Sequence, residues 1–224
     1  MKKKIVTVIS YLVVAITAIT FIYACTQHEL SPGAAVSDPT VAVTADNGNA
    51  SQPYFHKGVG APIDGELGRK WMANYERAVG HADVYTIKAS ELQLLLDRGA
   101  IGISLHYALD DMKQLHVLPM GVDAKGNIMR ATSVPTVTGS VDWATAQQWM
   151  GQHTGEIRAH FFGADTYVRL LKELKGDAVK TTLAMNDSGA LQLLMSDAAV
   201  DNPENVYDAS WVCPSVCPGQ PSQN

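Results

Sequence analysis

The 224-residue sequence has few aromatic residues, few charges and only three cysteines. Only one stretch of it is long and apolar enough to cross a bilayer, which excludes a polytopic membrane protein. A hydrophobic content of 46% excludes a wholly disordered or collagen-like chain. The length suits one domain of ordinary size or two small ones.

Familiar signatures of function are also missing. The sequence contains no GxSxG, P-loop, Rossmann or HExxH motif. Beyond its first four residues it has no basic run that could neutralise phosphates, so we exclude nucleic acid as a partner. We expect no cofactor, and the missing motifs favour a role other than catalysis.

Residues 1–24 have the layout of a secretory signal. Three lysines at positions 2–4 precede an uncharged run at residues 5–24. This run could also span a bilayer as a permanent helix. It ends in Ile-Tyr-Ala directly before Cys25, which resembles the lipobox of bacterial lipoproteins, with tyrosine where that motif commonly has a small residue.

The lipobox resemblance implies that the signal is cut before Cys25 and that Cys25 is acylated, for example with palmitate. More than one acyl chain would hold the protein firmly on a cell membrane or outer membrane, facing outside the cytoplasm, because each buried methylene contributes about 0.8 kcal/mol. The alternative is an uncleaved membrane anchor. Cleavage would remove three lysines and no acid, leaving 14 basic and 22 acidic residues and a net charge of −8.

Composition divides the rest of the chain into four segments. Residues 25–64 are rich in small and polar residues without a sustained period, which predicts a flexible tether. Residues 65–134 and 135–209 are interpreted as two similar α+β halves. Residues 210–224 form a Cys- and Pro-rich tail.

The two halves are matched by short clusters in the same order. Lys-Trp-Met at 70–72 recurs as Gln-Trp-Met at 148–150, and the other matched clusters keep nearly the same interval. Each half predicts helix, short extended segment, helix, strand, turn and strand. The expected fold is α+β, with two similar helix-helix-β-hairpin halves and an antiparallel sheet that has helices on one face. Chance similarity between the halves is the alternative.

Cys213 and Cys217 are the only thiols left once Cys25 is acylated. Outside the cytoplasm we expect them to form a structural disulfide. Thiol redox chemistry is an alternative, although redox pairs usually have two intervening residues at a helix start. A soft-metal site is another alternative, and it would need further ligands.

His106 and His116 fall in the two strands of the first expected hairpin. The turn of the second expected hairpin pairs Met185 with Leu191. By analogy, pairing Leu109 with Leu115 puts both imidazoles on one face of the sheet as diagonal neighbours. A register shifted by two residues would place them directly opposite each other, still on one face. Two imidazoles could ligate zinc or copper, but such a site needs a third ligand. We interpret them as surface histidines and predict no metal site, with metal ligation by this pair as the alternative.

The remaining candidates have structural interpretations. Carboxylate-pair chemistry, acid–base or glycosidic, is suggested by four acids: Asp110, Asp111, Asp123 and Asp201. Each lies in or beside an expected turn, where Asp hydrogen-bonds its own backbone, and we interpret them as turn residues. Trp71 and Trp149 are expected to be core anchors rather than a platform for sugars.

Three segments resemble motifs of uncharacterised secreted proteins of Bacteroidetes-type bacteria: Tyr-Ala-Leu-Asp at 107–110, Gly-Val-Asp-Ala at 121–124 and the Cys-Pro tail at 213–218. The resemblance implies location and fold unit, with no activity attached. The sequence thus predicts a lipid-anchored envelope protein that binds or scaffolds a partner. The alternative is a metal-binding or thiol-redox protein that uses the two C-terminal cysteines and the two hairpin histidines. A hydrolase with an unrecognised site is the third hypothesis.

Overall fold

The computed structural model describes residues 55–136, 139–213 and 217–218, all within one unit that spans residues 50–224. In this part of the chain the helices are α2 (Gly65–Val79), α3 (Ala89–Asp97), α4 (Trp143–Gln152) and α5 (Ala164–Glu173). The strands are β1 (Ala61–Asp64), β2 (Val84–Lys88), β3 (Gly102–Leu109), β4 (Leu115–Val122), β5 (Ser133–Thr136), β6 (Gly139–Asp142), β7 (Ala159–Gly163), β8 (Ala178–Met185), β9 (Leu191–Asp197), β10 (Asn205–Asp208) and β11 (Trp211–Cys213).

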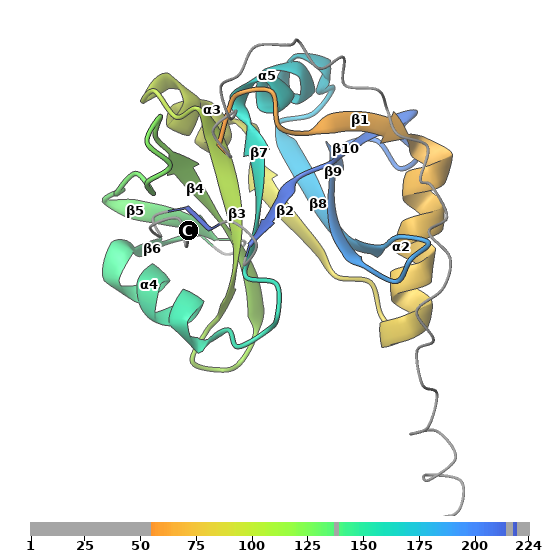
Figure 1. Cartoon of the computed structure of the whole chain (residues 1–224), viewed down its shortest axis with the longest axis horizontal. Coiled ribbons are helices and arrows are strands. Elements are labelled where there is room, and N and C mark those ends of the chain that lie inside the picture. Colours follow the sequence, from red (N-terminus) through yellow and green to blue (C-terminus); the bar gives the residue numbers. More distant parts are fainter. Residues whose placement is uncertain (1–54, 137–138, 214–216, 219–224) are drawn as a thin grey trace, which may run out of the picture. The chain divides into compact units, whose positions relative to one another are not determined.

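The strands form two main antiparallel sheets and a short hairpin (Figure 1). Sheet A has the order β1-β10-β9-β8-β2, sheet B has the order β11-β7-β3-β4, and β5 pairs with β6. Sheet A therefore joins two strands from the start of the domain to three from its end. Sheet B likewise places β7 and β11 beside the earlier hairpin β3–β4.

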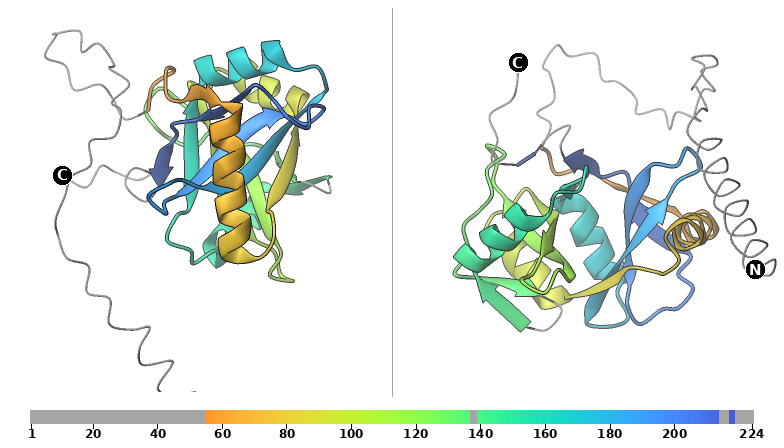
Figure 2. Two further views of the ribbon diagram at one scale, coloured as in Figure 1. Left: turned by 90° about the vertical axis from the view of Figure 1, so that its right-hand side faces the viewer. Right: turned by 90° about the horizontal axis from the view of Figure 1, so that it is seen from below.

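The domain is layered, with one helix outside each sheet (Figure 2). Side chains of both sheets meet in the main core, which includes Leu105 of β3 and Leu183 of β8. Helices α3 and α5 close one end of that core with Leu92 and Tyr167. On the outer faces, α2 packs against β8 and α4 against β3.

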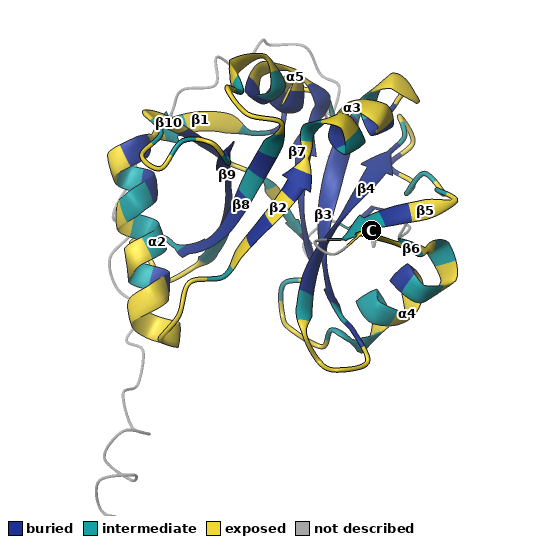
Figure 3. Cartoon of the chain, turned by 180° about the vertical axis from the view of Figure 1, so that it is seen from behind, coloured by how far each residue is buried: buried dark blue, intermediate teal, exposed yellow. Residues whose placement is uncertain are grey.

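The α+β class is confirmed, but the expected single sheet with helices on one face is wrong. The apolar residues Ile103, Leu105 and Tyr107 alternate along β3 and are buried, yet the intervening Ser104 and His106 are buried as well. Helix α4 covers the face on which these intervening side chains lie, so β3 is enclosed on both sides (Figure 3). Because the residues on the second buried face are small or polar, hydrophobic periodicity does not identify that face as buried.

The registers expected for the two hairpins are confirmed. Leu109 pairs with Leu115 in the first hairpin, and Met185 pairs with Leu191 in the second. The second turn uses Gly189 at φ 82°, the left-handed conformation that its three-residue loop requires.

Helix starts agree with the sequence in part. Asp64 caps α2 by accepting hydrogen bonds from the backbone N–H groups of Glu66 and Leu67. Asp142 caps α4 by accepting one from the backbone N–H of Thr145. Ser90 is of a residue type that often caps helices, but it lies inside α3, which begins at Ala89.

The folded domain extends beyond the segment boundaries drawn from composition. The expected tether ended at residue 64, but Val59 is buried and β1 pairs with β10. The expected tail began at residue 210, but β11 is part of sheet B. Residues 135, 136 and 139, where the expected second half begins, lie in the β5–β6 hairpin, and residues 137–138 fall outside the described residues.

Candidate functional site

A cavity of about 320 Å³ lies where the end of α5 meets the connection between β9 and β10. Its volume is at the lower end of the range of small-molecule sites, roughly 300–1,000 Å³. Leucine, valine and proline side chains line part of it. The polar lining consists of Glu173, Lys175, Asp197, Asn202, Glu204, Asn205 and Tyr207.

Tyr207 connects the cavity to the main core. It is 2% exposed, and its hydroxyl donates a hydrogen bond of 2.7 Å to Oε2 of Glu173. Burial raises the pKa of Tyr207, and the hydrogen bond to Glu173 and the negative charge of Glu173 raise it further. The tyrosine therefore remains a protonated donor that orients an exposed carboxylate at the cavity.

Asp197 fixes the turn after α5 against the end of β9. Its carboxylate accepts hydrogen bonds from the backbone N–H groups of Lys175 and Ala199. Burial alone would raise the pKa of Asp197, but these backbone hydrogen bonds outweigh burial and the pKa is lowered. Asp197 thus carries a charge whose oxygens are already bonded within the protein.

The loop on the other side of the cavity is attached to α2. Nη1 of Arg69 donates to the carbonyl of Pro203 at 3.3 Å, and the N–H of Gly65 donates to the carbonyl of Glu204 at 2.7 Å. The cavity therefore has walls from α5, from the end of β9 and from a tethered loop. With three carboxylates, two amides and one lysine, it is suited to ligands that donate hydrogen bonds.

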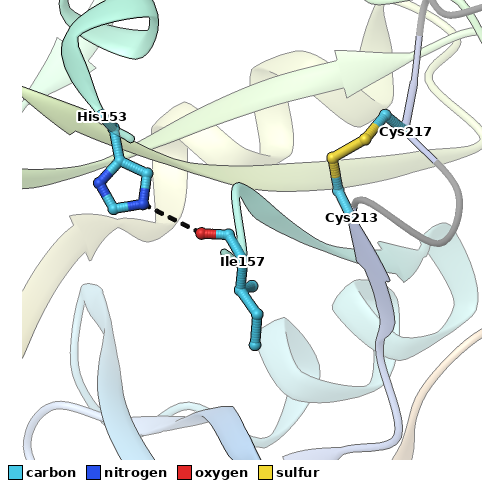
Figure 4. The surroundings of a disulfide bond; sticks show 4 residues. All are labelled: His153, Ile157, Cys213 and Cys217. Carbon is cyan, nitrogen blue, oxygen red and sulfur yellow. Dashed lines mark hydrogen bonds between the residues drawn. A yellow bond between two sulfur atoms is a disulfide. The ribbon is translucent and has the colours of Figure 1, made fainter. Parts of the chain in front are cut away.

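The expected disulfide between Cys213 and Cys217 is confirmed, with 4.8 Å between the two Cα atoms. Cys213 ends β11, is 3% exposed and lies opposite Ala159 of β7. Figure 4 shows the disulfide beside the start of β7, where Nε2 of His153 lies 3.0 Å from the carbonyl of Ile157.

His106 and His116 lie on one face of sheet B, as the predicted register requires. Leu118 lies opposite His106, and Ala108 lies opposite His116. The interpretation of the two as surface histidines is wrong, because they are only 8% and 5% exposed. The cover is again α4, whose Trp149 stacks on His116 with 5.0 Å between ring centroids.

Each of these histidines has its own surroundings. Nε2 of His116 lies 3.2 Å from Oδ2 of Asp110. Nδ1 of His116 and Nε2 of His106 are buried, and neither has a hydrogen-bond partner within the described part of the chain. Burial lowers the pKa of His106 to about 4, so its ring is neutral at physiological pH. Among the described residues, no group of three His, Cys, Asp or Glu side chains is arranged to hold a metal ion.

Two acids proposed as turn residues have that role. Asp110 accepts hydrogen bonds from the N–H groups of Met112 and Gln114. Asp123 accepts hydrogen bonds from the N–H groups of Lys125 and Asn127. The backbone hydrogen bonds lower the pKa of both carboxyls.

Trp71 and Trp149 are half-buried, and they pack against the outer face of sheet A and of sheet B respectively. Cys25 and the apolar run before it lie outside the described residues. None of the helices in residues 55–213 that the structure describes is long and apolar enough to cross a membrane.

Sequence reasoning missed the cavity and its polar residues. Glu173, Tyr207 and Asn205 belong to no recognised motif, and only the packing of α5 beside β9 and β10 brings them together. It also missed the hydrogen bond between Ser210 and His160, which are 50 residues apart. Comparison of the chain with protein-family models, with curated proteins and with solved structures found no match.

Proposed function

We propose that the chain is a lipid-anchored protein of the bacterial cell envelope whose folded domain binds a ligand or partner. The lipobox-like segment at Cys25 supports the anchor. The observation that carries the binding role is the cavity of about 320 Å³, in which buried Tyr207 orients the accessible carboxylate of Glu173. A fixed acceptor beside a hollow of this size is a common plan of small-ligand sites.

The lining favours a ligand rich in hydrogen-bond donors, such as an amino sugar or a polyamine. Carboxylates at Glu173 and Glu204 would accept bonds from hydroxyl or ammonium groups, and the amide of Asn205 could both donate and accept. Ligands that carry phosphate are disfavoured, because Lys175 is the only cation that lines the cavity among the described residues.

Thermal-shift titrations with glucosamine, N-acetylglucosamine and spermidine would test the binding role. We expect at least one of them to raise the unfolding temperature of the protein. The double variant Glu173→Ala/Asn205→Ala should lose this shift, whereas Glu76→Ala, which replaces an exposed acid outside the cavity, should keep it. No shift with any of the three, or an equal shift in both variants, would contradict the binding role.

The anchor is tested by the intact mass of the protein extracted from its own membranes without reduction. We expect a chain that begins at acylated Cys25 and contains the closed Cys213–Cys217 disulfide. A full-length chain without lipid would instead make residues 5–24 a membrane anchor.

We also propose that the domain is an internal duplication whose two halves exchange strands. The order strand-helix-strand-helix-strand-strand runs from β1 to β4 and again from β6 to β9. β8, β9 and β10 of the second half are completed in sheet A by β1 and β2 of the first. In sheet B, β3 and β4 of the first half are flanked by β7 of the second.

One observation favours the alternative of a metal-binding or thiol-redox protein. Ala159 lies opposite both Cys213 and His106, so the sulfur and the imidazole project from the same face of sheet B, about 10 Å apart at their Cα atoms. A metal site there would be supported if the wild-type protein retains copper or zinc after its disulfide is reduced and the His106→Leu variant does not. Metal-free protein with a disulfide that resists mild thiols would contradict both versions of this alternative.

A further inference from the structure

Ser210 lies where the chain crosses from one main sheet to the other. β10 ends at Asp208 in sheet A, and β11 begins at Trp211 in sheet B. Between them, Ala209 has a φ of 60°, a left-handed conformation that alanine adopts rarely. The turn brings Oγ of Ser210 to 2.7 Å from Nδ1 of His160 on β7.

His160 is held in place by the strands around it. It lies opposite Leu105 of β3 on one side and Val212 of β11 on the other, and it is 0% exposed. Its ring meets that of Tyr107 edge to face, with 5.8 Å between centroids. Because a ring fixed in this way cannot swing out of the sheet, its contact with Ser210 has a defined geometry.

His160 is in the neutral form that a proton acceptor must have, and its lowered pKa makes it a weak base. Burial lowers its pKa to about 4, so the imidazole is neutral at physiological pH. Its Nε2 atom has no hydrogen-bond partner among the described residues. In the tautomer that carries the proton on Nε2, Nδ1 accepts the hydrogen bond of the Ser210 hydroxyl.

The separation of the two side chains matches that of a nucleophile and its base, about 2.6–3.2 Å. The nucleophile is also the more exposed of the two side chains, as access by a substrate requires. Ser210 is only half-buried, whereas His160 is shielded completely. A substrate can therefore reach the Ser210 hydroxyl from solvent. The segment Asp-Ala-Ser-Trp at 208–211 matches no serine-hydrolase motif, so the sequence alone does not reveal the pair.

We propose that Ser210 and His160 are a nucleophile and general base that transfer acyl groups from activated carboxylic esters. The hydroxyl proton of Ser210 passes to Nδ1 of His160 as Oγ attacks the carbonyl carbon. The ester C–O bond then breaks, and the leaving alcohol takes the proton from Nδ1. A water molecule, deprotonated by His160 in the same way, releases the carboxylic acid and restores Ser210.

The surroundings of His160 restrict the substrate to acyl groups with good leaving groups. In the usual triad a carboxylate binds the second ring nitrogen and stabilises the imidazolium, and its loss costs about 10⁴-fold in rate. Nε2 of His160 has no such partner among the described residues. Esters or thioesters with acidic leaving groups need little help from the imidazolium, whereas amides need much.

The full-length protein, treated with p-nitrophenyl acetate, tests this proposal. We expect a burst of p-nitrophenol and one acetyl group, which peptide mass spectrometry should locate on Ser210. Ser210→Ala should lower the burst rate at least about 100-fold. The control Ser188→Ala, which removes an exposed hydroxyl in the turn between β8 and β9, should leave the burst unchanged.

An absent burst, an acetyl group on another residue, or an equal loss in the two serine variants would overturn the proposal. Because the acetyl group is located in the wild-type protein, the result does not depend on how well Ser210→Ala folds. The test is also independent of ligand binding at the cavity, since Ser210 and His160 are not among its lining residues.

Discussion

The outer faces of the two main sheets have the same construction but different contents. One helix covers each face and contributes a tryptophan, Trp71 on sheet A and Trp149 on sheet B. In sheet B the position opposite Leu118 holds His106, whereas in sheet A the position opposite Leu194 holds Thr182. The architecture thus specifies a buried side chain at this position and leaves its chemistry free.

The same comparison predicts opposite responses to pH. Sheet B buries His106 and His160, whose pKa values are each lowered by burial to about 4. Sheet A ends β10 with Asp208, which is 6% exposed and whose pKa is raised by burial to about 6. Acid should therefore destabilise the fold through the two histidines of sheet B, whereas neutral pH should destabilise it through Asp208 of sheet A.

The largest effect on stability should come from shortening a buried leucine on each outer face. Leu118 is 0% exposed and Leu194 is 2% exposed, so replacing either by alanine leaves a cavity beneath a helix. We expect Leu118→Ala and Leu194→Ala each to lower the free energy of unfolding by about 3–4 kcal/mol in urea titrations. A loss below about 1 kcal/mol at one site only would break the comparison, because that helix would then cover its sheet loosely.

Removing a buried imidazole should reduce acid sensitivity. Between pH 6.5 and about 4 the unfolded chain protonates at residue 106 and the folded chain does not, so wild-type stability falls as the pH falls. The difference between the unfolded and folded pKa values of His106 corresponds to a loss of about 3 kcal/mol in the free energy of unfolding. Urea titrations from pH 7 to 4 should show His106→Leu losing about 3 kcal/mol less than wild type. Thr182→Val, the match in sheet A, should lose as much as wild type.

Asp208→Asn should act in the opposite direction. The folded-state pKa lies above the unfolded value of 3.8, so the stability present at low pH is lost as the pH rises toward 6. Asparagine resembles the protonated acid, and the variant should be about 2–3 kcal/mol more stable than wild type at pH 7. The advantage should vanish near pH 3.5. Equal stability at pH 7 would show that the carboxylate is not buried in its charged form.

The smallest effect on stability should come from the disulfide, whose Cys213 ends β11 of sheet B. It closes a loop of about five residues, for which chain entropy predicts about 2 kcal/mol. Thermal unfolding of Cys213→Ala/Cys217→Ala against wild type would measure it. Acetylation of Ser210 should fall at the same time, because β11 holds the turn that contains it. Unchanged stability would mean that strand pairing with β7 already holds β11 in place.

Much of the local structure follows from the sequence. Alternating apolar residues and the turn ending in Gly189 predict both hairpins and their registers. Asp64 and Asp142 stand where helix caps are needed, and Cys213 and Cys217 are close enough along the chain to bond wherever the tail lies. These features depend on neighbours within a few residues, and side-chain chemistry at short range decides them.

Only the tertiary structure decided which faces are buried and which distant residues meet. His106 was expected at the surface because polar residues alternate with apolar ones in its strand, and it is buried because α4 packs over that face. The contacts of Tyr207 with Glu173 and of Ser210 with His160 join segments more than 30 residues apart. Periodicity describes one strand or helix at a time, whereas the pairing of β10 with β9 and of β11 with β7 depends on the packing of the whole domain.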